Sequence, residues 1–224
     1  MEINIFARKS TRVLRVLLPN YGKDWNERQL ARVANVSHVS VHYVFKKLNE
    51  MKLATRTQRN RIVLTDPLGL LRKWASYHRY DLVNKFLVYF TLEKEIDVLI
   101  GKIADLDLEY SFSGLVAAWL VAPSLPPRDL HLYVPSEEIA AKIAGKTELN
   151  AMSRGGNVKF VLPYDEGVFY GTRVVRGVKV VSNVQLYVDL CNAPARGGNP
   201  ASKILEQVLK EWKEEKEMQP KVKL

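Results

Sequence analysis

Polar side chains recur on one face of a segment near the N-terminus, at a spacing that suits contact with nucleic acid. In a helix over about residues 38–51, the apolar stripe would comprise Val41, Val44, Phe45, Leu48 and Met51. The opposite face then carries His38, Ser40, His42, Tyr43, Lys46, Lys47 and Asn49. A helix that presents such groups on one face can lie in the major groove of DNA. We predict base contacts from His38, Ser40 and Tyr43, and phosphate contacts from Lys46 and Lys47.

Three arginines follow in a segment whose residue types alternate. Residues 53–57 and 61–65 alternate like two strands, which Gln58-Arg59-Asn60 would join into a hairpin. From such a hairpin Arg56, Arg59 and Arg61 can reach the phosphate backbone or the minor groove. The helix and the hairpin together predict a double-stranded DNA interface.

Other interpretations of these side chains stay open. His38 and His42 have the i,i+4 spacing of a helical metal pair, but no Cys, Asp or Glu lies near them on that face, so we predict no metal site. Tyr43 would alternatively be partly buried and make no contact with DNA. The basic face would alternatively bind a protein.

The charge distribution supports a polyanionic partner. Residues 1–80 contain 16 Lys and Arg against 5 Asp and Glu, whereas residues 81–224 contain 18 against 19. Nucleic acid is the favoured polyanion, because the release of counterions from phosphates favours clustered cations. Solvation alone would not explain the scarcity of acidic residues in the first 80 positions.

The predicted elements of residues 1–80 are three helices, the hairpin and a connecting helix. We expect Ser10, Asn26 and Ser37 to cap the first three helices. Leu30, Val33 and Ala34 would face inward from the second helix. Residues 68–80 read as a helix carrying Leu70, Leu71, Trp74 and Tyr77, which predicts that residues 1–80 pack against the remainder rather than being loosely tethered.

Residues 30–48 and 51–56 resemble the winged helix-turn-helix superfamily of bacterial and archaeal regulators. The similarity includes the small Ala31, the turn at Val36, the core position Val41 and the run from Leu48 to Leu53. It implies a DNA-binding domain over residues 1–80. Regulators of this class often bind inverted repeats as homodimers, so a homodimer is expected.

Residues 81–224 alternate strands with helices, which predicts a mixed α/β domain and an α+β fold for the whole chain. The expected strands cover 86–90, 110–112, 131–134 and 157–162, with a hairpin over 169–181 that turns at Arg176-Gly177. The expected helices cover 93–103, 114–121 (capped by Ser113), a segment after Ser136, 184–192, and a last helix that begins at Asn199-Pro200.

Two motifs in this part resemble AbiE-type antitoxins of type IV toxin–antitoxin systems. They are Val181-Ser-Asn-Val-Gln-Leu-Tyr-Val-Asp-Leu-Cys-Asn-Ala-Pro-Ala-Arg-Gly, with a helix after it, and Phe112-Ser-Gly-Leu-Val-Ala-Ala-Trp. The resemblance implies a regulator that binds DNA upstream of its own operon and represses it, with a C-terminal domain that counteracts a partner toxin. The same architecture would equally serve a stand-alone transcription factor.

Asp189 and Arg196 of the first motif are candidates for a partner or anion site. An arginine in the Gly-rich loop 196–199, directly before a helix, is typical of anion binding. Alternatively, the glycines make the turn while Arg196 pairs structurally with Asp189 or another carboxylate.

An enzymatic function has less support. Ser113-Gly114, a helix, and Asp129-Leu-His131 are vaguely similar to the start of a nucleotidyltransferase domain. In that domain two strand carboxylates at i,i+2 bind metal ions. Here the second position is His131, so the site would be degenerate. Ser113 and Cys191 also have no identifiable base partner. We predict no catalytic residues and no cofactor.

Composition places the chain among ordinary globular proteins. Of 224 residues, 47% are apolar and 26% are charged, and the apolar run from Leu115 to Ala122 is far shorter than the ~20 residues that span a bilayer. The N-terminus lacks the apolar core of a secretory signal, and one cysteine permits no disulfide within the chain. We expect a cytoplasmic, sequence-specific transcriptional regulator. The alternatives are a winged-helix protein that acts chiefly through protein partners and a nucleotidyltransferase with a degenerate site.

Overall fold

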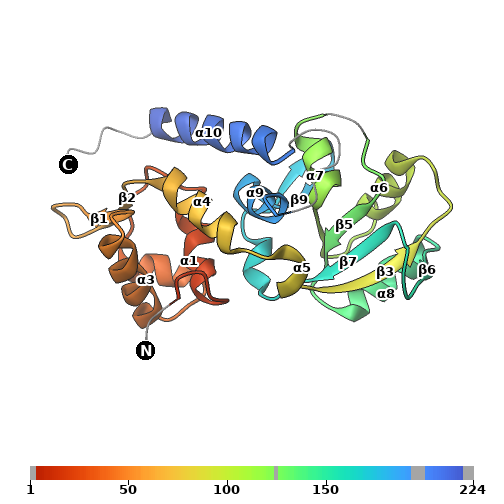
Figure 1. Ribbon diagram of the computed structural model, residues 1–224, viewed down its shortest axis with the longest axis horizontal. Helices are drawn as coiled ribbons and strands as arrows, with labels where there is room; N and C mark the ends of the chain where they lie inside the picture. The colour runs from red at the N-terminus through yellow and green to blue at the C-terminus, as the bar shows by residue number, and fades with distance from the viewer. Residues whose placement is uncertain (1–3, 124–125, 193–199, 219–224) are drawn as a thin grey trace.

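The described part of the chain contains two β-sheets of unequal size, one towards each end of the molecule (Figure 1). The computed structural model describes residues 4–123, 126–192 and 200–218. A two-stranded sheet lies with the N-terminal helices at one end, and a seven-stranded mixed sheet lies at the other. The structure combines many helices with a mixed sheet, and the predicted α+β fold is confirmed.

The N-terminal elements follow the predicted order. Helices α1 (Ser10–Leu17), α2 (Glu27–Val33) and α3 (His38–Glu50) precede strands β1 (Ala54–Arg56) and β2 (Ile62–Leu64), and α4 (Pro67–Tyr77) follows. The two strands are antiparallel, with Ala54 opposite Leu64. The core of these N-terminal elements combines aliphatic side chains, among them Leu14, Leu30 and Leu48, with the buried rings of Trp25 and Trp74.

Two of the three predicted helix caps are confirmed. The Asn26 side chain accepts hydrogen bonds from the backbone N–H groups of Arg28 and Gln29, and Ser37 accepts one from Ser40. Ser10 was wrongly predicted as a cap, because it is the first residue of α1 and Lys9 precedes it with helical dihedrals and no side-chain cap. Residues before Ser10 already form turns, so the N–H of Thr11 bonds to the carbonyl of Ala7.

Two predicted core residues are exposed instead. Val33 is 39% exposed, because Ala31 rather than Val33 lies beside Leu30 and Ala34 on the buried side of α2. Tyr77 is 54% exposed at the end of α4, where its ring lies 5.2 Å from that of Phe6.

The seven-stranded sheet has the order β6-β3-β7-β5-β4-β9-β8. Only β5 with β7 and β4 with β9 pair in parallel. Its strands are β3 (Lys85–Phe90), β4 (Ser111–Ser113), β5 (Leu130–Tyr133), β6 (Asn150–Ala151), β7 (Val158–Leu162), β8 (Arg173–Val175) and β9 (Val178–Val180). The predicted turn at Arg176-Gly177 is confirmed, and both residues have positive φ. Strand β6 was not predicted.

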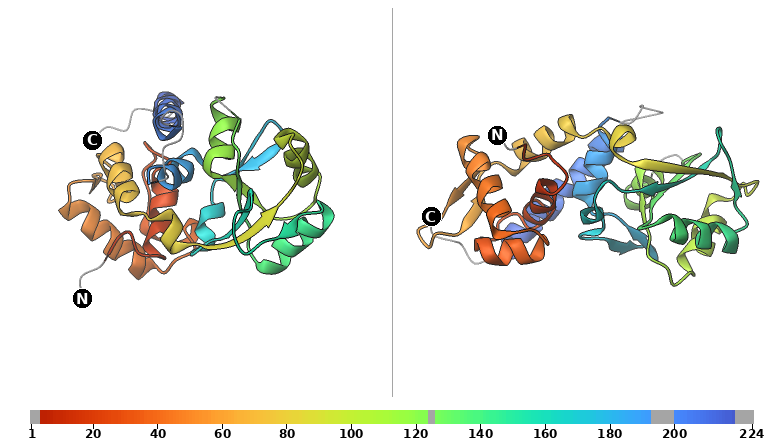
Figure 2. Two further views of the ribbon diagram at one scale, coloured as in Figure 1. Left: turned by 45° about the vertical axis from the view of Figure 1, so that its right-hand side comes forward. Right: turned by 90° about the horizontal axis from the view of Figure 1, so that it is seen from below.

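Helices cover this sheet and connect it to the N-terminal elements (Figure 2). They are α5 (Tyr80–Val83), α6 (Ile96–Ala104), α7 (Gly114–Val121), α8 (Glu137–Lys146), the 3₁₀ helix η1 (Glu166–Phe169), α9 (Asn183–Leu190) and α10 (Pro200–Met218). The predicted Ser136 cap is confirmed, because its side chain accepts from the N–H of Ile139. Asn199, the predicted cap of the last helix, lies outside the described residues. Helices α5 and η1 were not predicted.

Buried polar contacts join the N-terminal helices to the large sheet. Arg15 of α1 is 1% exposed, and its Nε donates to Oε1 of Gln185 in α9 at 2.8 Å. Arg12 donates from Nε to the buried carboxylate of Asp165 at 2.8 Å. Helix α10 runs back over the N-terminal helices, where Trp212 Nε1 donates to the carbonyl of Leu18 at 2.7 Å (Figure 1). The predicted packing of residues 1–80 against the remainder is confirmed.

Candidate nucleic-acid interface

The exposed face of α3 carries most of the side chains that the sequence analysis singled out for base or phosphate contact. His38, His42, Tyr43 and Lys46 are exposed, while Ser40 and Lys47 are half-buried. The buried residues Val41, Val44, Phe45 and Leu48 hold the opposite face against the core, so α3 cannot rotate without exposing them. Met51, predicted to end the apolar stripe, lies just beyond the helix and is half-buried.

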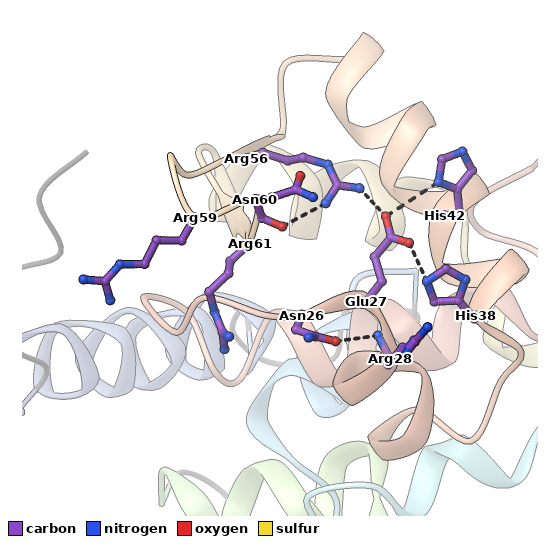
Figure 3. Close-up of a pocket in the computed structure, with 9 residues that line it drawn as sticks. All are labelled: Asn26, Glu27, Arg28, His38, His42, Arg56, Arg59, Asn60 and Arg61. Carbon is purple, nitrogen blue, oxygen red and sulfur yellow. Dashed lines mark hydrogen bonds and ion pairs between the residues drawn. The ribbon is translucent and has the colours of Figure 1, made fainter.

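Glu27 of α2 holds α3 and the β-hairpin together (Figure 3). One carboxylate oxygen lies 2.8 Å from Nε2 of His38, and the other lies 3.6 Å from Nδ1 of His42 and accepts from Arg56. The prediction that no Cys, Asp or Glu lies near His38 and His42 considered only the face of α3 that carries them, and α2 supplies Glu27 from outside that helix. No group of three or more metal-ligating side chains is found among the described residues. Arg56 adds a positive charge that disfavours a cation beside Glu27.

The charges around Glu27 determine its ionisation. Burial alone would raise the pKa of Glu27, but the hydrogen bond and charge of Arg56, followed by the charges of His38 and His42, outweigh it. The pKa of Glu27 is consequently lowered, and the carboxylate stays ionised at neutral pH. It offsets part of the positive charge at the junction of helix and hairpin.

The three arginines of the hairpin differ in what they contact. Besides Glu27, Arg56 donates to the carbonyl of Asn60 at 3.1 Å and lies over the ring of Phe45, 4.4 Å from its centroid. Arg61 pairs with Asp24, with 2.8 Å between Nε and Oδ1. Arg59 is exposed at the hairpin tip, and its side chain points away from the Glu27 cluster (Figure 3).

A cationic hollow lies between the hairpin and the two helices. Its volume is about 510 Å³, and its lining residues are Asn26, Glu27, Arg28, His38, His42, Arg56, Arg59, Asn60 and Arg61. Its arginines outnumber its single carboxylate, so the hollow favours an anionic occupant.

Sequence reasoning missed the acidic partners Glu27 and Asp24. Glu27 directly follows the cap of α2, where an acidic residue is already explained by the helix dipole. Its partner Arg56 is 29 positions away, so no local spacing indicates the contact. Knowledge of the tertiary fold is needed to place these groups together.

Asp189, a candidate for a partner or anion site, is buried in the structure. Its side chain is fully buried, and it accepts from Ser113 Oγ at 2.7 Å, Tyr133 Oη at 3.1 Å and Gln185 Nε2 at 2.7 Å. His78 Nε2 lies 3.2 Å from it. Gln185 thereby links this carboxylate to the buried guanidinium of Arg15. Arg196 lies outside the described residues.

Ser113, Gly114 and His131, three of the residues that resemble a nucleotidyltransferase site, make contacts within the buried part of the protein. Ser113 precedes α7 as expected but makes no cap bond, because its hydroxyl donates to Asp189. Gly114 has a φ of +62°, and a Cβ there would meet the His131 ring at 3.3 Å. His131 stacks on Tyr80, and burial, followed by the charge of Lys159, lowers the pKa of His131 to about 4.

Comparison with known proteins assigns the chain to a family. The model of a family described as transcriptional regulator, AbiEi antitoxin, type IV toxin–antitoxin system matches residues 61–210. The chain belongs to this AbiEi antitoxin family, which the sequence motifs had indicated. Searches of curated proteins and of solved structures found no significant match. Among the described residues, no helix is both long and apolar enough to cross a bilayer.

Proposed function

We propose that residues 1–80 form a winged helix-turn-helix domain that binds double-stranded DNA in a sequence-specific manner. The cationic hollow beside the exposed face of α3 is the observation that carries this proposal. It lies in the part of the chain where Lys and Arg outnumber Asp and Glu by 16 to 5. The family match begins at Arg61, so helices α1, α2 and α3 precede it.

In this proposal α3 enters the major groove and the β1–β2 hairpin is the wing. Lys46 is exposed on α3 and Arg59 at the hairpin tip, where each can approach a phosphate. Arg56 and Arg61 are paired with Glu27 and Asp24, so their main role is to fix the wing beside α3. A strand of the duplex backbone would occupy the hollow between wing and helix.

The remaining residues, 81–224, would form a second domain that binds a partner. The family is one of antitoxins, which supports a toxin as that partner. We further propose that the chain represses its own operon as a homodimer on an inverted repeat. The engagement of Ser113 with Asp189 and of His131 with Tyr80 supports a non-catalytic role for this domain.

Fluorescence anisotropy on the DNA upstream of the protein's own gene, compared with a scrambled duplex, tests the proposal. We expect tighter binding to the upstream DNA and an affinity that falls steeply with salt on both duplexes. Weak and equal binding to both would contradict it. A DNA-independent, salt-insensitive complex with another protein would then favour the partner-binding alternative.

A further inference from the structure

The residue at the centre of the outward face of α3 is apolar. Val41, Val44, Phe45 and Leu48 form the buried face of the helix. Val39 lies opposite them, and residues four and seven positions later, Tyr43 and Lys46, return to its side. Val39 is 58% exposed and Tyr43 is 46% exposed. Val39 and Tyr43 therefore place adjoining apolar side-chain surface on the outward face of α3, one to two turns from the cation Lys46.

The polar neighbours of Val39 make contacts within the protein. His38 and His42 contact Glu27, with 2.8 Å and 3.6 Å between the paired atoms. Ser40 Oγ lies 2.8 Å from Ser37 Oγ, and the Ser37 side chain caps the helix. These groups are therefore oriented towards α2 and the helix start. Val39 and Tyr43 therefore form the outward, solvent-exposed surface of the first two turns of α3.

We infer that Val39 determines DNA sequence preference by packing against the C5-methyl group of a thymine in the major groove. This inference rests on the proposed function, since it requires α3 to lie in that groove. Thymine alone among the four bases presents a methyl group there, and apolar side chains recognise it. Valine suits the contact because its branched side chain has one strongly preferred rotamer in a helix and loses little freedom on binding.

The positive charges around Val39 favour DNA over an apolar protein surface as the partner that covers it. Lys46 lies on the same face of α3, and Arg28 and Arg59 line the adjacent hollow. Duplex DNA combines phosphates for these cations with a methyl group at the depth of the groove. A purely apolar partner would leave the cations desolvated and unpaired.

Deoxyuridine substitution tests the contact, because it removes only the thymine methyl group. A preferred duplex is first selected from a random library with the full-length protein. Each thymine is then replaced in turn by deoxyuridine, and dissociation constants are measured by anisotropy. Wild-type protein should bind about fourfold more weakly at one or two positions, which corresponds to about 0.8 kcal/mol for one buried methyl group.

The variant Val39→Ala should lose this sensitivity at the same positions while keeping its fold, because the side chain is exposed and alanine favours helix. The matched control is Val174→Ala, which truncates a valine that is 69% exposed on β8, and it should keep the full fourfold effect.

Two results would overturn the inference while the proposed function stands. In the first, the wild-type protein prefers its duplex but tolerates deoxyuridine everywhere. In the second, Val39→Ala retains the full sensitivity. If no duplex is preferred over the others, both the inference and the proposed function fail.

Discussion

Replacement of Arg59 by alanine should weaken DNA binding in a manner that depends on salt. Arg59 is exposed at the tip of the β1–β2 hairpin, next to Asn60, which turns the chain with a φ of +56°. Its side chain points away from Glu27, unlike that of Arg56 (Figure 3). In the proposed complex Arg59 contacts one phosphate, so Arg59→Ala removes the release of about one counterion.

The expected magnitude follows from the salt dependence of one phosphate contact. Loss of that contact should reduce the slope of log K against log salt by about 0.9, so the defect of the variant should shrink about 3.5-fold between 50 and 200 mM salt. The defect should be the same on preferred and scrambled duplexes, because phosphate contacts carry no sequence information. Anisotropy titrations at four salt concentrations measure both quantities.

Arg176→Ala is the matched control. Arg176 is also an exposed arginine at a hairpin tip, with a φ of +51°, but its hairpin, β8–β9, belongs to the large sheet. The substitution changes the net charge equally, so it separates a local contact from an effect of total charge. A wild-type slope for Arg59→Ala, or an equally reduced slope for Arg176→Ala, would refute the placement of Arg59 against phosphate.

Three further predictions concern stability. Because the pKa of His131 falls from 6.5 to about 4 on folding, stability is full above pH 6.5 and declines as the pH falls towards 4. Acidification from pH 8 to 5 should cost about 2 kcal/mol more in wild type than in His131→Phe, as urea denaturation at both pH values would measure. Glu27 has a lowered pKa, so its contribution is present above pH 4.5 and is lost as the pH falls further. Urea denaturation at pH 5 and pH 3 should show that Glu27→Gln loses less stability on acidification than the wild type. An equal loss in both proteins would contradict the stabilising role of the Glu27 contacts. Asp189→Asn should lower the free energy of unfolding by about 3 kcal/mol, because it removes the buried carboxylate that accepts hydrogen bonds from Ser113, Tyr133 and Gln185. The exposed control Asp107→Asn should change it by less than about 0.5 kcal/mol.

Local signals in the sequence were sufficient for much of the fold. Asn26 and Ser37 were identified as caps because a cap contacts groups only two or three residues away. The turn at Arg176-Gly177 was likewise predicted from a short sequence. The two-residue strand β6 has no pattern of its own, since it exists only through pairing with Tyr89 and Phe90 of β3.

The candidate site could be predicted only as a set of residues on one face. The sequence identified the polar face of α3 but not that Glu27 contacts His38 and His42 on that face and Arg56 on the hairpin, because these partners lie 11, 15 and 29 positions away. Asp189 was named as a candidate for a partner or anion site from its place in the motif alone, which does not indicate its burial. Its burial follows from Ser113 and Tyr133, which arrive from distant strands.

Methylation interference on a selected duplex most directly tests whether α3 lies in the major groove. Guanine N7 faces only that groove, so a methyl group placed there obstructs an inserted helix without altering base pairing. We predict that N7-methylation of one or more guanines within the preferred site abolishes binding by the wild-type protein. Undiminished binding to a duplex methylated at every guanine of the site, together with displacement of the protein by a minor-groove ligand, would contradict the placement of α3.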